Sequence, residues 1–130
     1  MGGPETVLLI AADGFTRRIT ADGLAMYGHR VLLAKDGREA LDILQADPGL
    51  VGMLVADAEL GDGLGVARMA RLLDPAIGVI LTARSPGSVP ERGRVRGALL
   101  LRSPYGTSEI VAAIDGLRGA ASADPARRAA

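Results

Sequence analysis

Asp57 is the residue of this chain best placed to do chemistry. It ends an apolar run of strand length at residues 52–57, and an acidic, glycine-rich segment follows it at 58–63. A continuous apolar run of this length is typical of a strand that is buried on both faces of a parallel sheet. Open α/β sheets place their ligands at the carboxyl ends of such strands, so Asp57 is expected to lie in a functional site.

Other polar residues follow apolar segments in the same way. Asp13 comes after the segment 6–11, Thr82 ends the segment 77–82, and Ser103 follows the segment 98–101. If these segments are neighbouring parallel strands, their carboxyl ends converge on one side of the sheet. We therefore expect Asp57 and these three residues to lie close together, with Glu59 and Asp62 on the rim of the site.

The segments that must position these residues alternate between strand and helix patterns. Strands are predicted at 6–11, 29–35, 52–57, 77–82 and 98–101, and helices at about 15–27, 36–46, 64–73 and 107–117. Proline and glycine interrupt the helical pattern between 83 and 96, so the fourth helix is expected to be shortened or irregular. The alternation predicts a doubly wound, flavodoxin-like α/β fold with a five-stranded parallel sheet of order 2-1-3-4-5.

Length and composition favour one domain with an aliphatic core. The 130 residues include one Phe, two Tyr, no Trp and no Cys, and we expect a lead at 1–5, a domain at 6–118 and a flexible tail at 119–130. Fifteen basic residues balance fifteen acidic ones, so no bulk charge favours nucleic acid or a membrane as a partner. The expected location is the cytoplasm.

Together these motifs resemble the receiver domain of two-component response regulators over about residues 6–117. The resemblance lies in the order and spacing of five motifs: Asp57 after its apolar strand, Leu60-Gly61-Asp62-Gly63-Leu64-Gly65, Leu81-Thr82-Ala83-Arg84, Gly97-Ala98 and Ser103-Pro104-Tyr105. The family has Leu-Pro-Asp-Gly-Asp-Gly in the second of these places and Lys-Pro-Phe in the last.

The resemblance implies a role for each of these positions. Asp57 would accept a phosphoryl group from a histidine kinase or phosphotransfer protein, and the Thr82 hydroxyl would bind a phosphoryl oxygen. Two acids after the first strand, Asp57 and the carbonyl of Glu59 would hold Mg²⁺, and a lysine would neutralise the phosphoryl charge. Such a domain is a signalling module of a phosphorelay and not an enzyme.

The chain departs from this pattern at the positions that hold the charges. Alignment puts Ala11 and Ala12 on the two acids, Ser103 on the lysine and Leu100 on the aromatic switch position. Because Mg²⁺ prefers anionic oxygen ligands, its binding is expected to be weak or absent, with Asp57, Asp13 and Glu59 as the remaining candidate ligands. The chain is therefore predicted to be a pseudo-receiver that acts through a protein partner, either another signalling protein or a second copy.

Two alternatives remain open. Asp57 could be a working phosphoacceptor with a rebuilt cation site, in which Arg84 or Arg102 meets the phosphoryl group. A more distant alternative is a haloacid-dehalogenase-like phosphatase, with Asp57 and Glu59 as the nucleophile–acid pair and Thr82 binding phosphate.

Some features have simple structural interpretations. Asp57 and Thr82 could cap their strands and do nothing more. His29 opens the second strand at the far end of the sheet and is expected at the surface. Ser103-Pro104 is expected to keep the cis peptide bond of the family.

Overall fold

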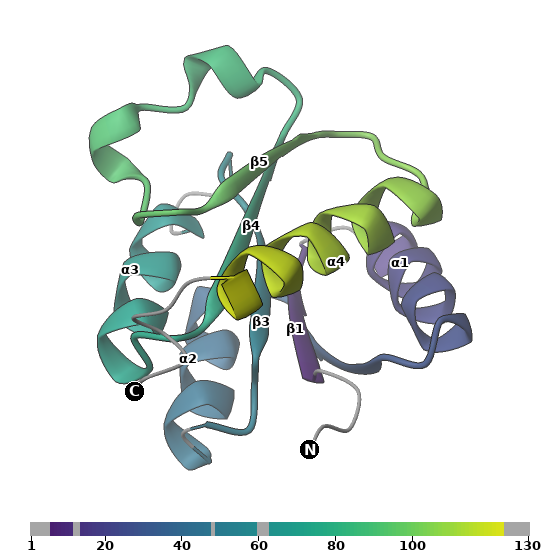
Figure 1. Cartoon of the computed structure of the whole chain (residues 1–130), viewed down its shortest axis with the longest axis horizontal. Coiled ribbons are helices and arrows are strands. Elements are labelled where there is room, and N and C mark those ends of the chain that lie inside the picture. The colour runs from purple at the N-terminus through teal and green to yellow at the C-terminus, as the bar shows by residue number, and fades with distance from the viewer. Residues whose placement is uncertain (1–5, 12–13, 48, 60–62, 124–130) are drawn as a thin grey trace.

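The computed structural model describes residues 6–11, 14–47, 49–59 and 63–123. Its five parallel strands have the order β2-β1-β3-β4-β5, which confirms the predicted topology (Figure 1). The strands are β1 (Thr6–Ile10), β2 (Arg30–Ala34), β3 (Met53–Asp57), β4 (Gly78–Ala83) and β5 (Leu99–Arg102). The α-helices are α1 (Gly14–Met26), α2 (Gly37–Ala46), α3 (Gly63–Leu73) and α4 (Thr107–Ala123).

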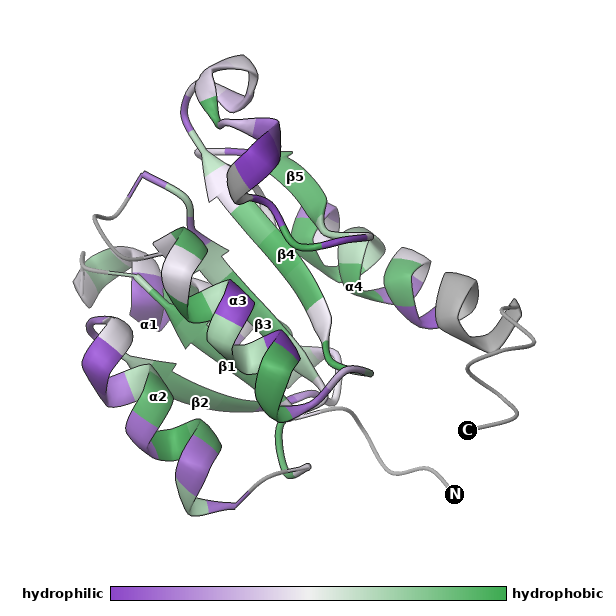
Figure 2. Cartoon of the chain, turned by 90° about the vertical axis from the view of Figure 1, so that its left-hand side faces the viewer, coloured by the Kyte–Doolittle hydropathy of each residue, from purple (hydrophilic) through white to green (hydrophobic). Residues whose placement is uncertain are grey.

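Helices cover both faces of the sheet, so the core has two layers. Side chains of α2 and α3 pack on one face with Leu8, Leu54 and Leu81, whereas α1 and α4 pack on the other with Leu9 and Ile80 (Figures 1 and 2). β1 is buried along its whole length, and β3 is buried up to its last residue, Asp57. This burial on both faces explains why these strands are continuous apolar runs in the sequence.

The connection from β4 to β5 contains no α-helix, as expected from its prolines and glycines. Two short 3-10 turns, Pro86–Ser88 and Glu91–Gly93, take the place of a fourth helix. Arginine side chains hold the connection to the fold: Arg71 donates to the carbonyl oxygen of Arg96 at 2.7 Å, and Arg94 donates to that of Val89 at 2.6 Å. An irregular backbone needs such partners because its carbonyls lack the bonds that a helix would provide.

Helix α1 is packed closely against the start of α4. Gly23 is buried, and a Cβ atom in its place would lie 2.5 Å from the hydroxyl oxygen of Thr107. The glycine that weakens the helix pattern in the sequence is therefore the residue that permits this contact.

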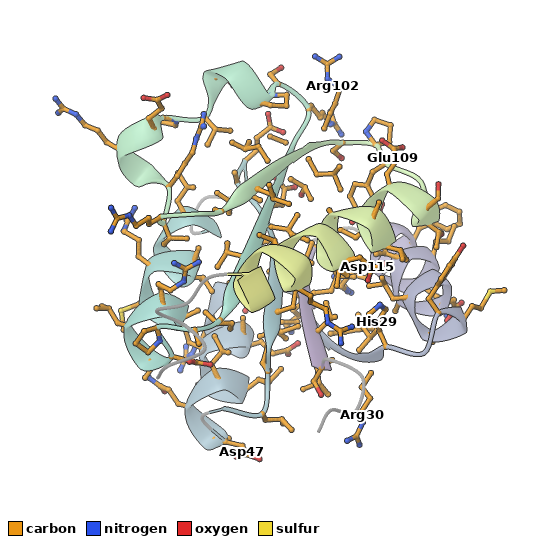
Figure 3. All side chains as sticks on the ribbon, viewed as in Figure 1. His29, Arg30, Asp47, Arg102, Glu109 and Asp115 are labelled. Atoms are coloured by element: carbon orange, nitrogen blue, oxygen red, sulfur yellow. The ribbon has the colours of Figure 1, made fainter. Side chains whose placement is uncertain are left out.

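Two predictions differ from the structure. α4 continues to Ala123, so the last helix does not end near Leu117 as predicted, while the remainder of the predicted tail lies outside the described residues. His29 was expected at the surface, but only 8% of it is exposed, because the chain turns inward after α1, where the N–H group of His29 donates to the carbonyl oxygen of Leu24. Figure 3 shows His29 far from Arg102, at the opposite end of the sheet from the strand termini.

Within the described ranges, no helix is both long and apolar enough to cross a lipid bilayer.

Candidate functional site

Asp57 ends β3 directly beside Thr82 of β4. The two residues are partners in the β3–β4 register. Thr82 is 6% exposed and Asp57 is partly buried. The Asp57 Oδ1 atom accepts a hydrogen bond of 2.8 Å from the N–H group of Glu59, which fixes the direction of the carboxylate. The aligned sheet ends thus bring the predicted acceptor and the predicted hydroxyl together.

A cavity of about 270 Å³ lies over these strand ends. Its lining brings together the predicted site residues Asp57, Glu59, Thr82 and Ser103. The remaining lining residues are Leu9, Ile10, Ala11, Thr16, Arg84 and Tyr105. Asp13 and Asp62, which were expected at this edge, lie outside the described residues, as does Ala12.

The Glu59 carboxylate joins the ends of β3 and β4. Its Oε1 atom accepts from the N–H group of Arg84 at 2.9 Å, and its Oε2 atom accepts from the N–H group of Ser85 at 3.3 Å. Both carboxylate oxygens are therefore engaged with the backbone that follows β4. A cation at Glu59 would compete with these two charge-assisted hydrogen bonds.

Tyr105 is a residue of the cavity that the sequence analysis passed over. It follows the cis peptide bond Ser103-Pro104, and its hydroxyl lies 3.4 Å from that of Thr20 in α1. Burial raises the pKa of the Tyr105 phenol above its ordinary value of 10.0, the hydrogen bond to Thr20 opposes this, and the Asp57 charge raises it further. The available signal was the aromatic at the third position of the Ser-Pro-Tyr motif.

Two arginines bring positive charge to the same end of the sheet. Arg84 lines the cavity. The Arg17 guanidinium donates from Nη1 to the carbonyl oxygen of Ala11, at the position where the family has its acids. Arg102, the other candidate cation, is exposed at the end of β5 and does not line the cavity. Arg17 was not among the predicted site residues, since its helix position alone gives no sign that it turns back to β1.

The donor set of this cavity does not fit a Mg²⁺ ion. Mg²⁺ demands octahedral oxygen coordination with carboxylate ligands, and the β1 wall offers Leu9, Ile10 and Ala11 instead. Among the residues that the structure describes, no group of three or more acidic, histidine or cysteine side chains could hold a metal ion. Asp57 and Glu59 both border the cavity, but Glu59 is already hydrogen-bonded, so only one of these two carboxylates is without such competition from the backbone beyond β4.

The sequence is similar to that of a known response regulator. It is 35% identical over 112 residues to the response regulator MprA of Mycolicibacterium vanbaalenii, an alignment that covers 84% of this chain and 48% of that protein. The chain thus spans about half the length of this curated relative. No family model matches the chain.

Solved receiver domains share the fold. A response regulator receiver protein from Sinorhizobium medicae superposes with a TM-score of 0.75 at 21% identity, covering 88% of this chain and 94% of that one. The N-terminal domain of a response regulator/sensory box/GGDEF protein from Carboxydothermus hydrogenoformans gives 0.79 at 18% identity, with 92% and 98% covered. The chemotaxis protein CheY4 of Vibrio cholerae gives 0.75 at 20% identity, with 88% and 99% covered.

Proposed function

We propose that this chain, a receiver domain of the response-regulator family by sequence similarity and fold, is a pseudo-receiver in phosphorelay signalling. In this proposal, Mg²⁺-dependent phosphorylation of Asp57 is weak or absent, and the domain acts by binding another protein. A histidine kinase, a phosphotransfer protein or another signalling protein is the expected partner. The coarser statement, that the chain is a signalling domain of the receiver type, rests on the sequence relative and the fold together.

The observation that carries this proposal is the composition of the cavity beside Asp57. Transfer of a phosphoryl group onto a carboxylate accumulates negative charge, which must be neutralised by positioned cations. The β1 side of the cavity is made of Leu9, Ile10 and Ala11, and the β5 side begins at Ser103. Both places from which the family supplies or binds a cation are therefore uncharged here.

The test is a phosphorylation assay on the full chain and on Asp57→Ala. Each protein is treated with acetyl phosphate, or with beryllofluoride, in the presence and absence of Mg²⁺, and is followed by amide NMR and a phosphate-affinity gel. We expect spectra and mobility that do not depend on Mg²⁺ and that are the same in both proteins apart from the mutated site. A response that requires both Mg²⁺ and Asp57 would overturn the proposal.

A second candidate function is a working phosphoacceptor in which Arg84 replaces the missing cation. It is favoured by one observation: Arg84 lines the cavity, and its backbone N–H group is fixed by Glu59 at 2.9 Å. A guanidinium can bind two phosphoryl oxygens at once. This candidate predicts labelling of Asp57 without Mg²⁺ that is lost in Arg84→Gln and kept in Arg92→Gln, an exposed arginine of the same connection. Hydrolysis of a generic phosphatase substrate would instead favour the phosphatase alternative.

A further inference from the structure

Helix α1 exposes a stripe of large apolar side chains along its outer face. Phe15 is 74% exposed, Ile19 is 50% exposed and Met26 is 86% exposed. With Asp22 these residues have the spacing 4-3-4, so at 3.6 residues per turn they fall within about 60° of the helix circumference. This is the spacing by which one helix packs along another.

The stripe holds most of the aromatic residues of the protein. The chain has one Phe and two Tyr, and Phe15 and Tyr27, which is 59% exposed, both lie on or just after α1. Aromatic side chains and methionine are enriched in protein interfaces, where they provide large buried area at small entropic cost. In a chain so poor in aromatics, their exposure here indicates a contact surface.

The position of α1 leaves this face open. α1 packs against β1, β2 and α4, and Figure 1 shows it at one edge of the molecule, with its outer side turned away from the sheet. Its buried residues, Thr20, Gly23 and Leu24, lie on the opposite side of the helix. The exposed stripe is therefore not part of the core.

The charges beside the stripe are self-complementary. Arg18 and Asp22 are both exposed and lie on the same flank of the stripe. If two copies of α1 pack antiparallel about a two-fold axis at the level of residues 20 and 21, Phe15 of each copy lies opposite Met26 of the other. The same axis places Arg18 of each copy opposite Asp22 of the other, so that two ion pairs form by symmetry.

We propose that this face of α1 binds a second copy of the chain, as an antiparallel helix pair. Helix α3 provides the contrast, since it also exposes Met69 and Leu72. The charged residues within α3, Arg68 and Arg71, are all positive, so two copies of that helix would repel one another. Charge complementarity thus selects α1 and selects a second copy as its occupant.

The contact is small, and the dimer is therefore reversible. A stable interface buries about 800 Å² on each partner, which is more than one exposed helix face of this length provides. The expected behaviour is a concentration-dependent equilibrium between monomer and dimer. The proposal does not depend on phosphorylation of Asp57, which lies beyond the buried side of α1.

Analytical ultracentrifugation of the full chain over a wide concentration range tests the dimer. We expect reversible self-association that Met26→Lys weakens about tenfold or more, because a charge would be placed in the centre of the contact. The matched control is Leu72→Lys on α3, which is 77% exposed and should leave the association unchanged. A monomer at every concentration, or a dimer that persists in Met26→Lys, would overturn the proposal and leave a different protein as the partner of α1.

Charge reversal tests the antiparallel arrangement. Arg18→Asp and Asp22→Arg each create two like-charge pairs in the proposed dimer, so each variant alone should associate less than the natural chain. An equimolar mixture of the two variants restores both ion pairs and should regain the association. If the mixture associates no better than the separate variants, the helices do not pair in this way. Circular dichroism of each variant confirms that it is folded.

Discussion

The two inner strands and the two outer walls of the acceptor cavity differ in what they preserve. β3 and β4 end in Asp57 and Thr82, which are register partners and carry the groups expected of a receiver domain. The walls at the ends of β1 and β5 carry Ala11 and Ser103, where the family has an acid and a lysine. The retained groups and the replaced ones thus lie on opposite sides of the same cavity.

The difference teaches that the fold and the chemistry of this cavity are held by different residues. The core needs apolar side chains along β1, β3 and β4, and these are fully buried. The polar residues that end the strands contribute little to that core, so they can change while the sheet stays the same. The engaged carboxylate of Glu59 and the Arg17 contact to Ala11 show how the remaining polar groups are satisfied within the fold.

The largest expected effect comes from restoring the outer walls. The triple variant Ala11→Asp, Ala12→Asp and Ser103→Lys should bind Mg²⁺ at least about a hundredfold more tightly than the natural chain, because it regains two anionic oxygen ligands. Isothermal titration calorimetry measures the affinity. Mg²⁺ should also raise the melting temperature of the variant, since a ligand that binds only the folded state stabilises it.

The control for this variant separates ligand geometry from net charge. Ala46→Asp with Ala112→Asp adds two carboxylates at exposed positions of α2 and α4 and should not acquire a Mg²⁺ site. If the triple variant binds Mg²⁺ no better than this control, the replaced walls do not explain the proposed loss of metal binding.

The next effect in size tests whether the inner strands are as constrained as they look. A Cβ atom at Gly63 would lie 2.0 Å from the backbone carbonyl oxygen of Asp57, which cannot move without distorting β3. Gly63→Ala should therefore cost about 3 kcal/mol in the free energy of unfolding. Urea denaturation measures this cost, and the amide resonances around Asp57 should shift.

Gly65 is the matched control because it lies in the same helix with open space around it. A Cβ atom there would meet only Arg68 Nη2, at 4.0 Å. Gly65→Ala should stabilise the protein by up to about 1 kcal/mol through helix propensity. Equal destabilisation by both substitutions would show that α3 itself, rather than its approach to Asp57, determines the result.

Much of the fold could be predicted because its signals are local. The apolar runs fix the strands, and the turn residues between them fix the alternation, so the sheet order and the irregular β4–β5 connection were both confirmed. The residues at the strand ends followed from this topology. The structure places Asp57, Glu59, Thr82 and Ser103 around one cavity, while their chemical roles remain predictions.

The rest could not be predicted, since it depends on contacts between distant segments. His29 is buried because the chain turns inward after α1, which no pattern near residue 29 indicates. Arg17 reaches the carbonyl oxygen of Ala11, and Tyr105 reaches Thr20, only once the helices are docked on the sheet. Single positions of this kind carry no periodicity, so their partners become visible only in three dimensions.

The smallest expected effect asks whether the charge retained at Asp57 acts across the cavity on the β5 wall. The pKa of Tyr105 is raised above 10.0, first by burial and further by the Asp57 charge. Asp57→Asn should therefore lower the pKa of Tyr105, though not to its ordinary value, since burial remains. The measurement is alkaline titration of tyrosine absorbance, with Tyr105→Phe identifying the transition that belongs to this residue.

The sign of the stability effect follows from the same shift. A raised pKa means that the folded protein favours the neutral phenol, so this contribution to stability is complete below pH 10.0 and is lost as the pH rises through the higher folded-state pKa. At neutral pH, Tyr105→Phe should cost only about 0.5 kcal/mol, because the hydrogen bond that it removes is long. An unchanged pKa of Tyr105 in Asp57→Asn would mean that the two walls are electrostatically independent, and that burial alone sets the ionisation of this side of the cavity.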